Sequence, residues 1–201
     1  MKYRAPETID TGGGNWLDKP GTYHLIITAA TESPLKKNGE MLDGFRITCQ
    51  AIDGTVRDSA GFTEKDKTVE LMFWHPKLTD KNEGMFSRQK QAKLFIATGL
   101  LTEEQLGQEV DLDLEDVVGK QIIATLEANE GDTGRTFLDL HFSDLWHVDD
   151  PAAAKCPKNQ KAIELMPPSH RRKAESFAKR NGQDLTHKPK AKLETVDLDD
   201  L

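Results

Sequence analysis

The chain has 201 residues, a net charge of −7 and only two cysteines, Cys49 and Cys156. This length suits one domain with an extension. The cysteines lie in one apolar and one polar segment, so they do not indicate a disulfide framework, and a reducing compartment is favoured. No apolar run reaches the roughly 18 residues of a membrane span, and the N-terminal residues lack a signal peptide's apolar segment. We therefore expect a cytoplasmic protein without membrane contact.

Charge is distributed unevenly along the chain. Residues 155–193 hold eleven Lys or Arg against three acids, whereas the last eight residues, 194–201, hold four acids and no base. A terminal segment of this composition cannot bury a core, and the aliphatic and aromatic residues lie mostly before residue 150. The sequence thus predicts an N-terminal arm (1–20), a folded domain (21–150), a basic flexible linker (151–193) and an acidic tail (194–201).

Alternating apolar residues and turn signals predict the elements of the domain. Lys36-Lys37-Asn38-Gly39 is a hairpin turn between the first two strands, and residues 55–65 have the composition of a loop. Apolar residues at helical spacing indicate one helix, near whose end Gly99 lies. In chain order we predict strands at 22–30, 42–52 and 67–75, a helix at 87–100, strands at 121–127 and 135–147, and a short helix at 170–181.

This order of elements indicates a mostly β fold. Five antiparallel strands with a helix between the third and fourth are typical of a Greek-key barrel of the OB type. A two-layer α+β sandwich built from the same elements is the alternative. Either fold would leave the segment after residue 150 as a flexible C-terminal extension.

Alternation along the strands assigns one set of side chains to the core and the other to solvent. The outward set combines aromatic rings with cations. A base stacked on an aromatic ring gains roughly 1–3 kcal/mol whatever its identity, and nearby Lys or Arg neutralises phosphates. We expect seven residues to form a face for single-stranded nucleic acid: Lys36, Lys37, Arg46, Trp74, Lys77, Arg135 and Phe137.

Five of these residues also have a purely structural interpretation. Trp74 could be half-buried against the following helix, and Phe137 could pack under the N-terminal arm with Trp16. Arg46 could pair with a carboxylate across the sheet. Lys36 and Lys37 could be ordinary turn lysines.

The sequence shows no catalytic, metal-binding or cofactor motif. The six histidines lack the HExxH spacing, and no pair of closely spaced cysteines accompanies them. Gly12-Gly13-Gly14 is not followed by the Lys of a phosphate-binding loop. We therefore expect a non-enzymatic protein that needs no metal or cofactor.

Three stretches resemble the bacteriophage single-stranded-DNA-binding proteins that are built on one OB-fold. They are Pro20-Gly-Thr-Tyr-His-Leu-Ile-Ile27, Lys36-Lys-Asn-Gly-Glu-Met-Leu42 and Arg88 to Leu101. The resemblance covers roughly residues 20–150 and the acidic tail. It implies a protein that coats single-stranded DNA cooperatively in phage replication, recombination or repair.

The resemblance also implies that the tail contacts replication or recombination proteins. This tail ends in Asp199-Asp200-Leu201, where the best-known bacterial relatives end in Pro-Phe. The expected partner-binding residues are Asp197, Leu198, Asp199, Asp200 and Leu201. Two other functions remain as alternatives: a protein–protein adaptor or inhibitor whose acidic body mimics nucleic acid, and a recombination nuclease.

Overall fold

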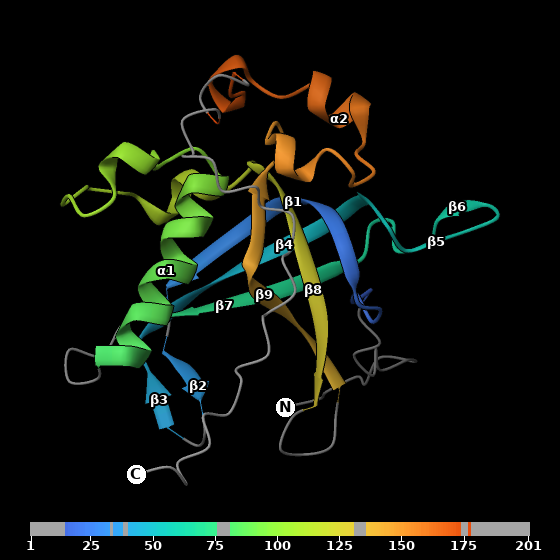
Figure 1. The fold of residues 1–201 in the computed structure, drawn as a ribbon. Helices are drawn as coiled ribbons and strands as arrows, with labels where there is room; N and C mark the ends of the chain where they lie inside the picture. The colour runs from blue at the N-terminus through green and yellow to red at the C-terminus, as the bar shows by residue number, and fades with distance from the viewer. Residues whose placement is uncertain are drawn as a thin grey trace, which may run out of the picture.

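An antiparallel sheet of five strands forms the body of the molecule, in the order β7–β4–β1–β8–β9 (Figure 1). The structure, a computed structural model, describes residues 15–32, 34–37, 40–75, 81–130, 136–173 and 177, without the side chains of 35–42, 81–85, 136 and 141–143. The strands are β1 (Gly21–Glu32), β4 (Gly44–Gly54), β7 (Thr68–Trp74), β8 (Gln121–Glu130) and β9 (Thr136–His147). The predicted strands are thus confirmed, with β1 and β8 each extending further than expected.

The core lies on the inner face of this sheet, where alternation along each strand sends the apolar residues. In β4, Ile47 and Cys49 are completely buried. Arg46, which precedes Ile47 in the strand, is exposed on the opposite face. Phe45 stacks on Phe73 of the neighbouring β7, with ring centroids 5.0 Å apart. The largest fully buried apolar side chains are Tyr23, Leu25, Ile27, Ile47, Leu71, Phe73, Leu94, Ile122, Ile123 and Leu126.

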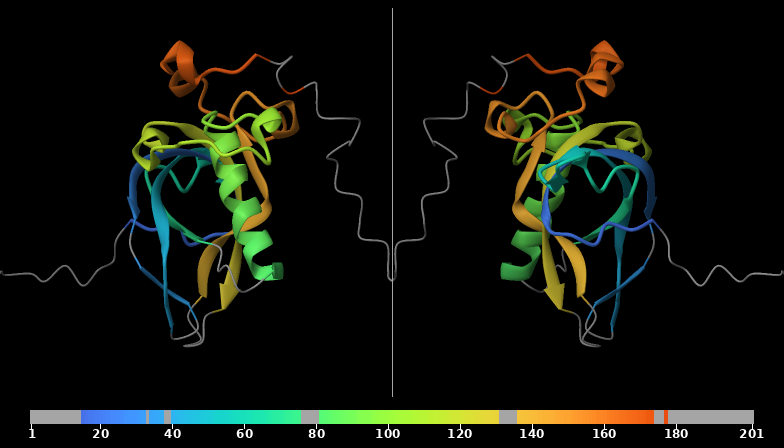
Figure 2. Two further views of the ribbon diagram at one scale, coloured as in Figure 1. Left: turned by 90° about the vertical axis from the view of Figure 1, so that its left-hand side faces the viewer. Right: turned by 90° about the vertical axis from the view of Figure 1, so that its right-hand side faces the viewer.

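A helix, α1 (Lys81–Ala97), connects β7 to β8 and packs against both β9 and β7 (Figure 2). Its last residue lies two positions before Gly99, whose φ of 74° suits glycine, and its first residue lies six positions before the predicted start at 87. Two short 3₁₀ turns follow, η1 (Glu103–Gln105) and η2 (Leu114–Val117). None of the helices in the described part of the chain combines the length and apolar character needed to cross a membrane.

Helix α1 lies where the two edge strands of the sheet approach each other. In the described residues no hydrogen-bonded ladder joins β7 to β9, so the sheet is not closed. The prediction of a mostly β fold, with five antiparallel strands and a helix between the third and fourth, is therefore confirmed. Closure into a barrel is not established by these strand pairings.

Two small hairpins project from the sheet. Strands β2 (Leu35–Lys37) and β3 (Glu40–Leu42) pair at the site of the predicted turn. Strands β5 (Arg57–Asp58) and β6 (Gly61–Phe62) form a second hairpin where the sequence predicted a loop. The β2–β3 hairpin and the far end of the β8–β9 hairpin point to the same end of the molecule, at the bottom of Figures 1 and 2.

Residues 151–173, here called the C-terminal strap, cover the end of the domain opposite the β2–β3 and β8–β9 hairpins (Figure 1). The strap contains η3 (Pro151–Ala153), a short helix α2 (Gln160–Glu164) and η4 (Pro168–His170). Its Ala153 and Cys156 form a second apolar cluster with Ile123 of β8. A third cluster joins its Ile163 and Met166 to Val148.

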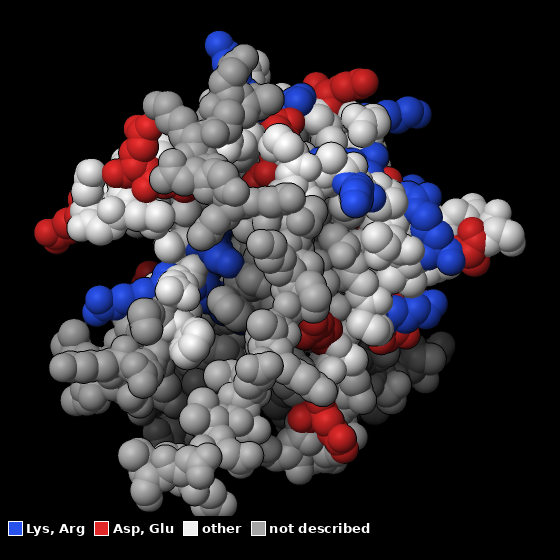
Figure 3. All heavy atoms as spheres, viewed as in Figure 1, with Lys and Arg blue, Asp and Glu red and all other residues white. Residues whose placement is uncertain are grey.

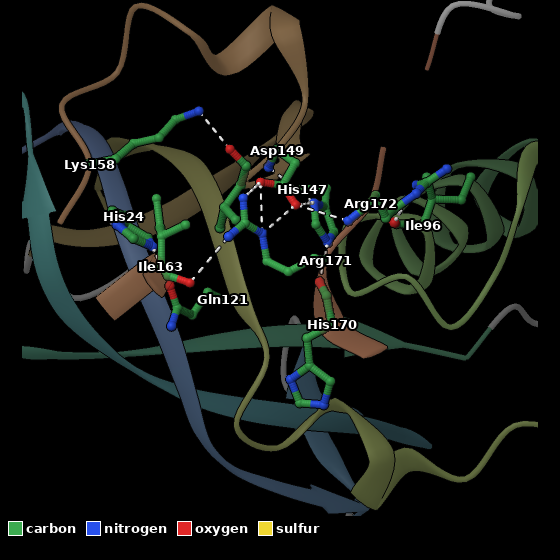
Figure 4. A network of polar contacts seen from close by, with 11 residues as sticks. His24, Ile96, Gln121, His147, Asp149, Lys158, Ile163, His170, Arg171 and Arg172 are labelled. Carbon is green, nitrogen blue, oxygen red and sulfur yellow. Dashed lines mark hydrogen bonds and ion pairs between the residues drawn. The ribbon is translucent and has the colours of Figure 1, made fainter. Parts of the chain in front are cut away.

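Polar contacts fix the strap to the domain as well (Figure 4). The Arg171 guanidinium donates to both carboxylate oxygens of Asp149, at 2.8–3.1 Å. Arg172 donates through its backbone N to Asp149 and through Nη1 to the carbonyl of Ile96, at 2.9 and 3.3 Å. The predicted flexible linker of residues 151–193 is therefore wrong for residues 151–173, because burial and these hydrogen bonds hold them. The remainder of that linker, except Phe177, lies outside the described residues.

The chain does not begin a helix at residue 170, where the sequence predicted a short helix over 170–181. The η4 turn ends at His170, and Arg171 after it has extended backbone dihedrals. Residues 174–176 and 178–181 lie outside the described part of the chain.

Candidate functional site

The outer surface of β4 and β7, here called the β4–β7 face, gathers the outward side chains that the sequence singled out. The antiparallel register places Gly44 opposite Trp74, Arg46 opposite Met72 and Thr48 opposite Glu70. Since the intervening residues are buried, this set projects away from the core. The face consists of Arg46, Thr48 and Gln50 of β4 and Thr68, Glu70, Met72 and Trp74 of β7.

Arg46 is the cation at the centre of this face. Its side chain is 45% exposed, and Nη1 lies 3.8 Å from Oε2 of Glu70 on β7. The carboxylate pairing that was the structural alternative for Arg46 is therefore present. A surface ion pair of this kind is worth at most about 1 kcal/mol, so a phosphate could replace Glu70 at little cost.

Trp74 ends β7 diagonally across from Arg46, next to helix α1. Its side chain is half-buried, as the structural alternative for this residue expected. Lys90 of α1 places its Nζ 5.9 Å from the centre of the indole ring and 3.3 Å from Oδ1 of Asp139 on β9. Gln91 donates from Nε2 to the Trp74 carbonyl at 2.9 Å. The helix thus holds Trp74 in place beside a cation, with part of the side chain still accessible.

The two hairpins at the same end carry other predicted residues. Lys36 pairs with Met41 and Lys37 with Glu40 in the β2–β3 hairpin, and their side chains are not described. Phe137 pairs with Asn129 near the end of the β8–β9 hairpin and is 47% exposed. Arg46 and Trp74 thus lie next to the β2–β3 hairpin, where β4 begins and β7 ends, whereas the strand register places Phe137 beyond the other end of β1.

Several predicted residues lie outside the described part of the chain. They are Lys77, Arg135 and the partner-binding residues Asp197, Leu198, Asp199, Asp200 and Leu201. Their roles in binding stay predictions. Among the described residues, no three His, Cys, Asp or Glu side chains are arranged to hold a metal ion.

Sequence analysis missed one large aromatic residue beside the face. Trp16 belongs to the segment before β1 that the sequence assigned to an N-terminal arm, yet it forms a parallel bridge with Thr68 of β7. Its indole is 47% exposed. The only available signal was an isolated Trp next to an apolar Leu17 in a polar stretch, and such a pattern does not reveal a pairing partner.

Ion pairs around a buried carboxylate anchor this segment. Glu64 is completely buried, and its two oxygens lie 3.1 Å from Lys19 Nζ and 2.8 Å from Lys67 Nζ. Lys67 also donates to Asp18 at 2.9 Å. Hydrogen bonds to Glu64 and Asp18 raise the pKa of Lys67, and the bond from Lys67 lowers the pKa of Asp18. Lys19 and Lys67 are thus both engaged in ion pairs that hold this segment.

Acidic side chains gather elsewhere, over the connection between α1 and β8 (Figure 3). A shallow hollow there is lined by Glu32, Asp111, Asp113, Glu115 and Asp116. These negatively charged carboxylates repel phosphate, so this surface would direct a nucleic acid away from itself. Basic side chains lie along α1 in the same view.

No protein-family model matches the chain, and no curated protein sequence is significantly similar to it. The function must therefore be inferred from the residues of the β4–β7 face and of the β2–β3 and β8–β9 hairpins.

Proposed function

We propose that this protein binds single-stranded DNA with little sequence preference and coats it during phage replication, recombination or repair. The acidic tail would recruit protein partners or regulate binding. The observation that carries the proposal is the grouping of Arg46, Met72 and Trp74 on one outer face, at the ends of β4 and β7 next to the β2–β3 hairpin. The resemblance of residues 20–150 to phage single-stranded-DNA-binding proteins supports it.

We propose an OB-fold for this domain, and the strand order β7–β4–β1–β8–β9 supports it. In such folds the second and third strands and the loops between strands 1–2 and 4–5 bind oligonucleotides. Here the second and third long strands are β4 and β7, and the first loop contains the β2–β3 hairpin. The second loop joins β8 to β9. This fold assignment therefore directs the nucleic acid to the same residues that the side-chain chemistry favours.

The binding mode follows from the side chains on the face. Trp74 and Phe137 would stack on bases, while Arg46, Lys36, Lys37, Lys77 and Arg135 would neutralise phosphates. Both interactions tolerate any base, because every base has a π-face and every nucleotide a phosphate. Lys90, which is largely buried and paired with Asp139, orients the indole of Trp74 and is not one of these phosphate contacts.

The test compares fluorescent single-stranded and double-stranded oligonucleotides of equal length in a salt titration. We expect much tighter binding to the single strand, with affinity falling steeply as salt rises, because released counterions drive part of the binding. Arg46→Ala should lower the slope of log affinity against log salt by about one, while Lys155→Ala, on the strap, serves as its control. Equal affinity for both forms of DNA would exclude the proposal.

A protein–protein function is the second candidate, because the described surface includes the acidic hollow lined by Glu32 and residues 111–116. An adaptor or inhibitor that mimics nucleic acid would use that surface and would not bind oligonucleotides. The same titration separates the two functions. A nuclease would in addition cleave the oligonucleotide when magnesium is present.

A further inference from the structure

We propose that Trp16 is a base-stacking residue that extends the single-strand path past the outer edge of β7. This inference rests on the proposed function and adds a contact from outside the sheet. None of the seven residues predicted from the sequence lies in this segment.

Backbone hydrogen bonds hold Trp16 in a fixed place beside β7. The Thr68 backbone N donates to the Asn15 carbonyl at 2.6 Å, and the Leu17 backbone N donates to the Thr68 carbonyl at 2.7 Å. The Asn15 side chain also donates to the Asp66 carbonyl at 2.9 Å. The residues immediately before and after Trp16 are therefore both hydrogen-bonded to Thr68 of β7.

The direction of the indole follows from strand alternation. Leu17 is buried in the core, so its neighbour Trp16 projects outward. Thr68, its bridge partner, belongs to the β4–β7 face. Residues paired across neighbouring strands project to the same side. Trp16 and this face therefore form one continuous surface, on which Trp16 is the most exposed aromatic residue.

A large exposed indole on a rigid segment is well suited to stacking. It offers a flat apolar surface, and little conformational entropy is lost when a base binds, because the backbone is already ordered. Trp16 lies six residues along β7 from Trp74, which at about 3.3 Å per residue is about 20 Å. At about 3.4 Å per stacked nucleotide this spans roughly six nucleotides, within the roughly 4–16 that OB-folds contact.

The surroundings predict that Trp16 contributes stacking but no charge. Lys19, three residues after Trp16, and Lys67, next to its bridge partner Thr68, are paired with Glu64 and Asp18. Loss of the indole should therefore lower the affinity for single-stranded DNA by the same factor at every salt concentration. Arg46→Ala, in contrast, should change the salt slope, so these two variants separate stacking from phosphate contact on one surface.

The experiment measures affinity for a dT oligonucleotide of about 15 nucleotides with Trp16→Ala and Trp16→Phe. Trp16→Ala should lose roughly fivefold to a hundredfold in affinity, the usual range for one stacked base, with an unchanged salt slope. Trp16→Phe should recover most of it. Both variants should melt like the wild type, because the indole is exposed. Leu165→Ala, an exposed apolar residue on the strap, is the matched control and should bind normally.

Tryptophan fluorescence supplies an independent measurement. The chain has three tryptophans, Trp16, Trp74 and Trp146, and Trp146 packs beneath the strap with Ile123. In a variant that keeps only Trp16, with Phe at the other two positions, dT oligonucleotide should quench the emission. A variant that keeps only Trp146 should show no quenching.

The outcomes distinguish this inference from the proposed function. If the wild type binds single strands but Trp16→Ala binds equally well and Trp16 is not quenched, the inference is wrong and the proposed function stands. If the wild type does not bind single strands, both are wrong.

Discussion

His24 lies on the outer side of β1, between two core residues, yet none of its surface is exposed. The strap covers it: the backbone N of Asn159 donates to Nδ1 at 3.1 Å, and Nε2 lies 3.0 Å from Oε1 of Gln121. Because Nδ1 accepts a hydrogen bond, the ring is neutral with its proton on Nε2. Gln121 in turn donates to the carbonyl of Ala162 in the strap at 2.9 Å.

The burial of His24 makes the stability of the folded protein sensitive to acid. It lowers the pKa from the ordinary 6.5 to about 4, so the unfolded chain takes up a proton first. Folding stability is then complete above pH 6.5 and falls as the pH drops towards 4, by about 3 kcal/mol at about 1.4 kcal/mol per pH unit. His147, whose pKa burial also lowers, acts in the same direction.

Urea unfolding at pH 7 and pH 4.5 checks this prediction. The wild type should lose clearly more stability between the two than His24→Gln, whereas a variant at the exposed His75, His75→Gln, should follow the wild type. If His24→Gln loses as much stability on acidification as the wild type, the histidine is not the source.

At the scale of elements, the strap is part of the folded domain. Ile163 of α2 is buried against Val148 and Met166, while Leu165, two residues later, is 84% exposed. Apolar burial and hydrogen bonds to the carbonyls of Val148 and of Ile96 in α1 offset the entropy that ordering this segment costs. A domain that ended at residue 150 would leave Ile123 and His24 uncovered.

The pair of residues in the strap supplies a matched test. Ile163→Ala should destabilise the protein by about 2–5 kcal/mol, the usual cost of such a truncation in a core. Leu165→Ala should change stability by less than about 0.5 kcal/mol. Equal melting temperatures for the two variants would mean that the strap does not pack as described.

At the scale of the whole molecule, the strap and the two hairpins occupy opposite ends (Figure 2). Phe177, the last described residue, contacts the guanidinium of Arg172 at 4.4 Å and lies near His147. Residues 178–201 therefore continue from the strap and not from the β4–β7 face. At about 3.3–3.6 Å per residue, 24 residues span up to about 80 Å, so the acidic end has the length to reach that face.

We expect the four acids of 194–201 to compete with phosphate for the cationic face at low salt, where screening is weak. A chain ending at residue 193 should then bind single-stranded DNA more tightly than the full chain at low salt, and the difference should vanish as salt rises. A chain ending at residue 177 also loses the bases of 178–193, and it should bind more weakly than 1–193 if they touch DNA. Superimposed salt titrations of all three chains would show that neither segment meets the DNA.

The sequence by itself determined the order of the five long strands and the helix, because these depend on local patterns. Alternation in 42–52 and 67–75 assigned Arg46 and Trp74 to the outer side, and the glycine after the apolar stripe marked the end of α1. These patterns extend over only a few consecutive residues, so they can be recognised without knowing the tertiary structure.

Only the tertiary structure decided what covers each outer surface. Alternation shows that His24 and Ile123 leave the inner core, but not that a strap more than 25 residues further along buries them. It likewise could not place Trp16 beside Thr68, or Lys90 between Trp74 and Asp139. Such contacts join segments far apart in the chain, and the free energy that selects them comes from packing and burial summed over the whole molecule, which no local pattern contains.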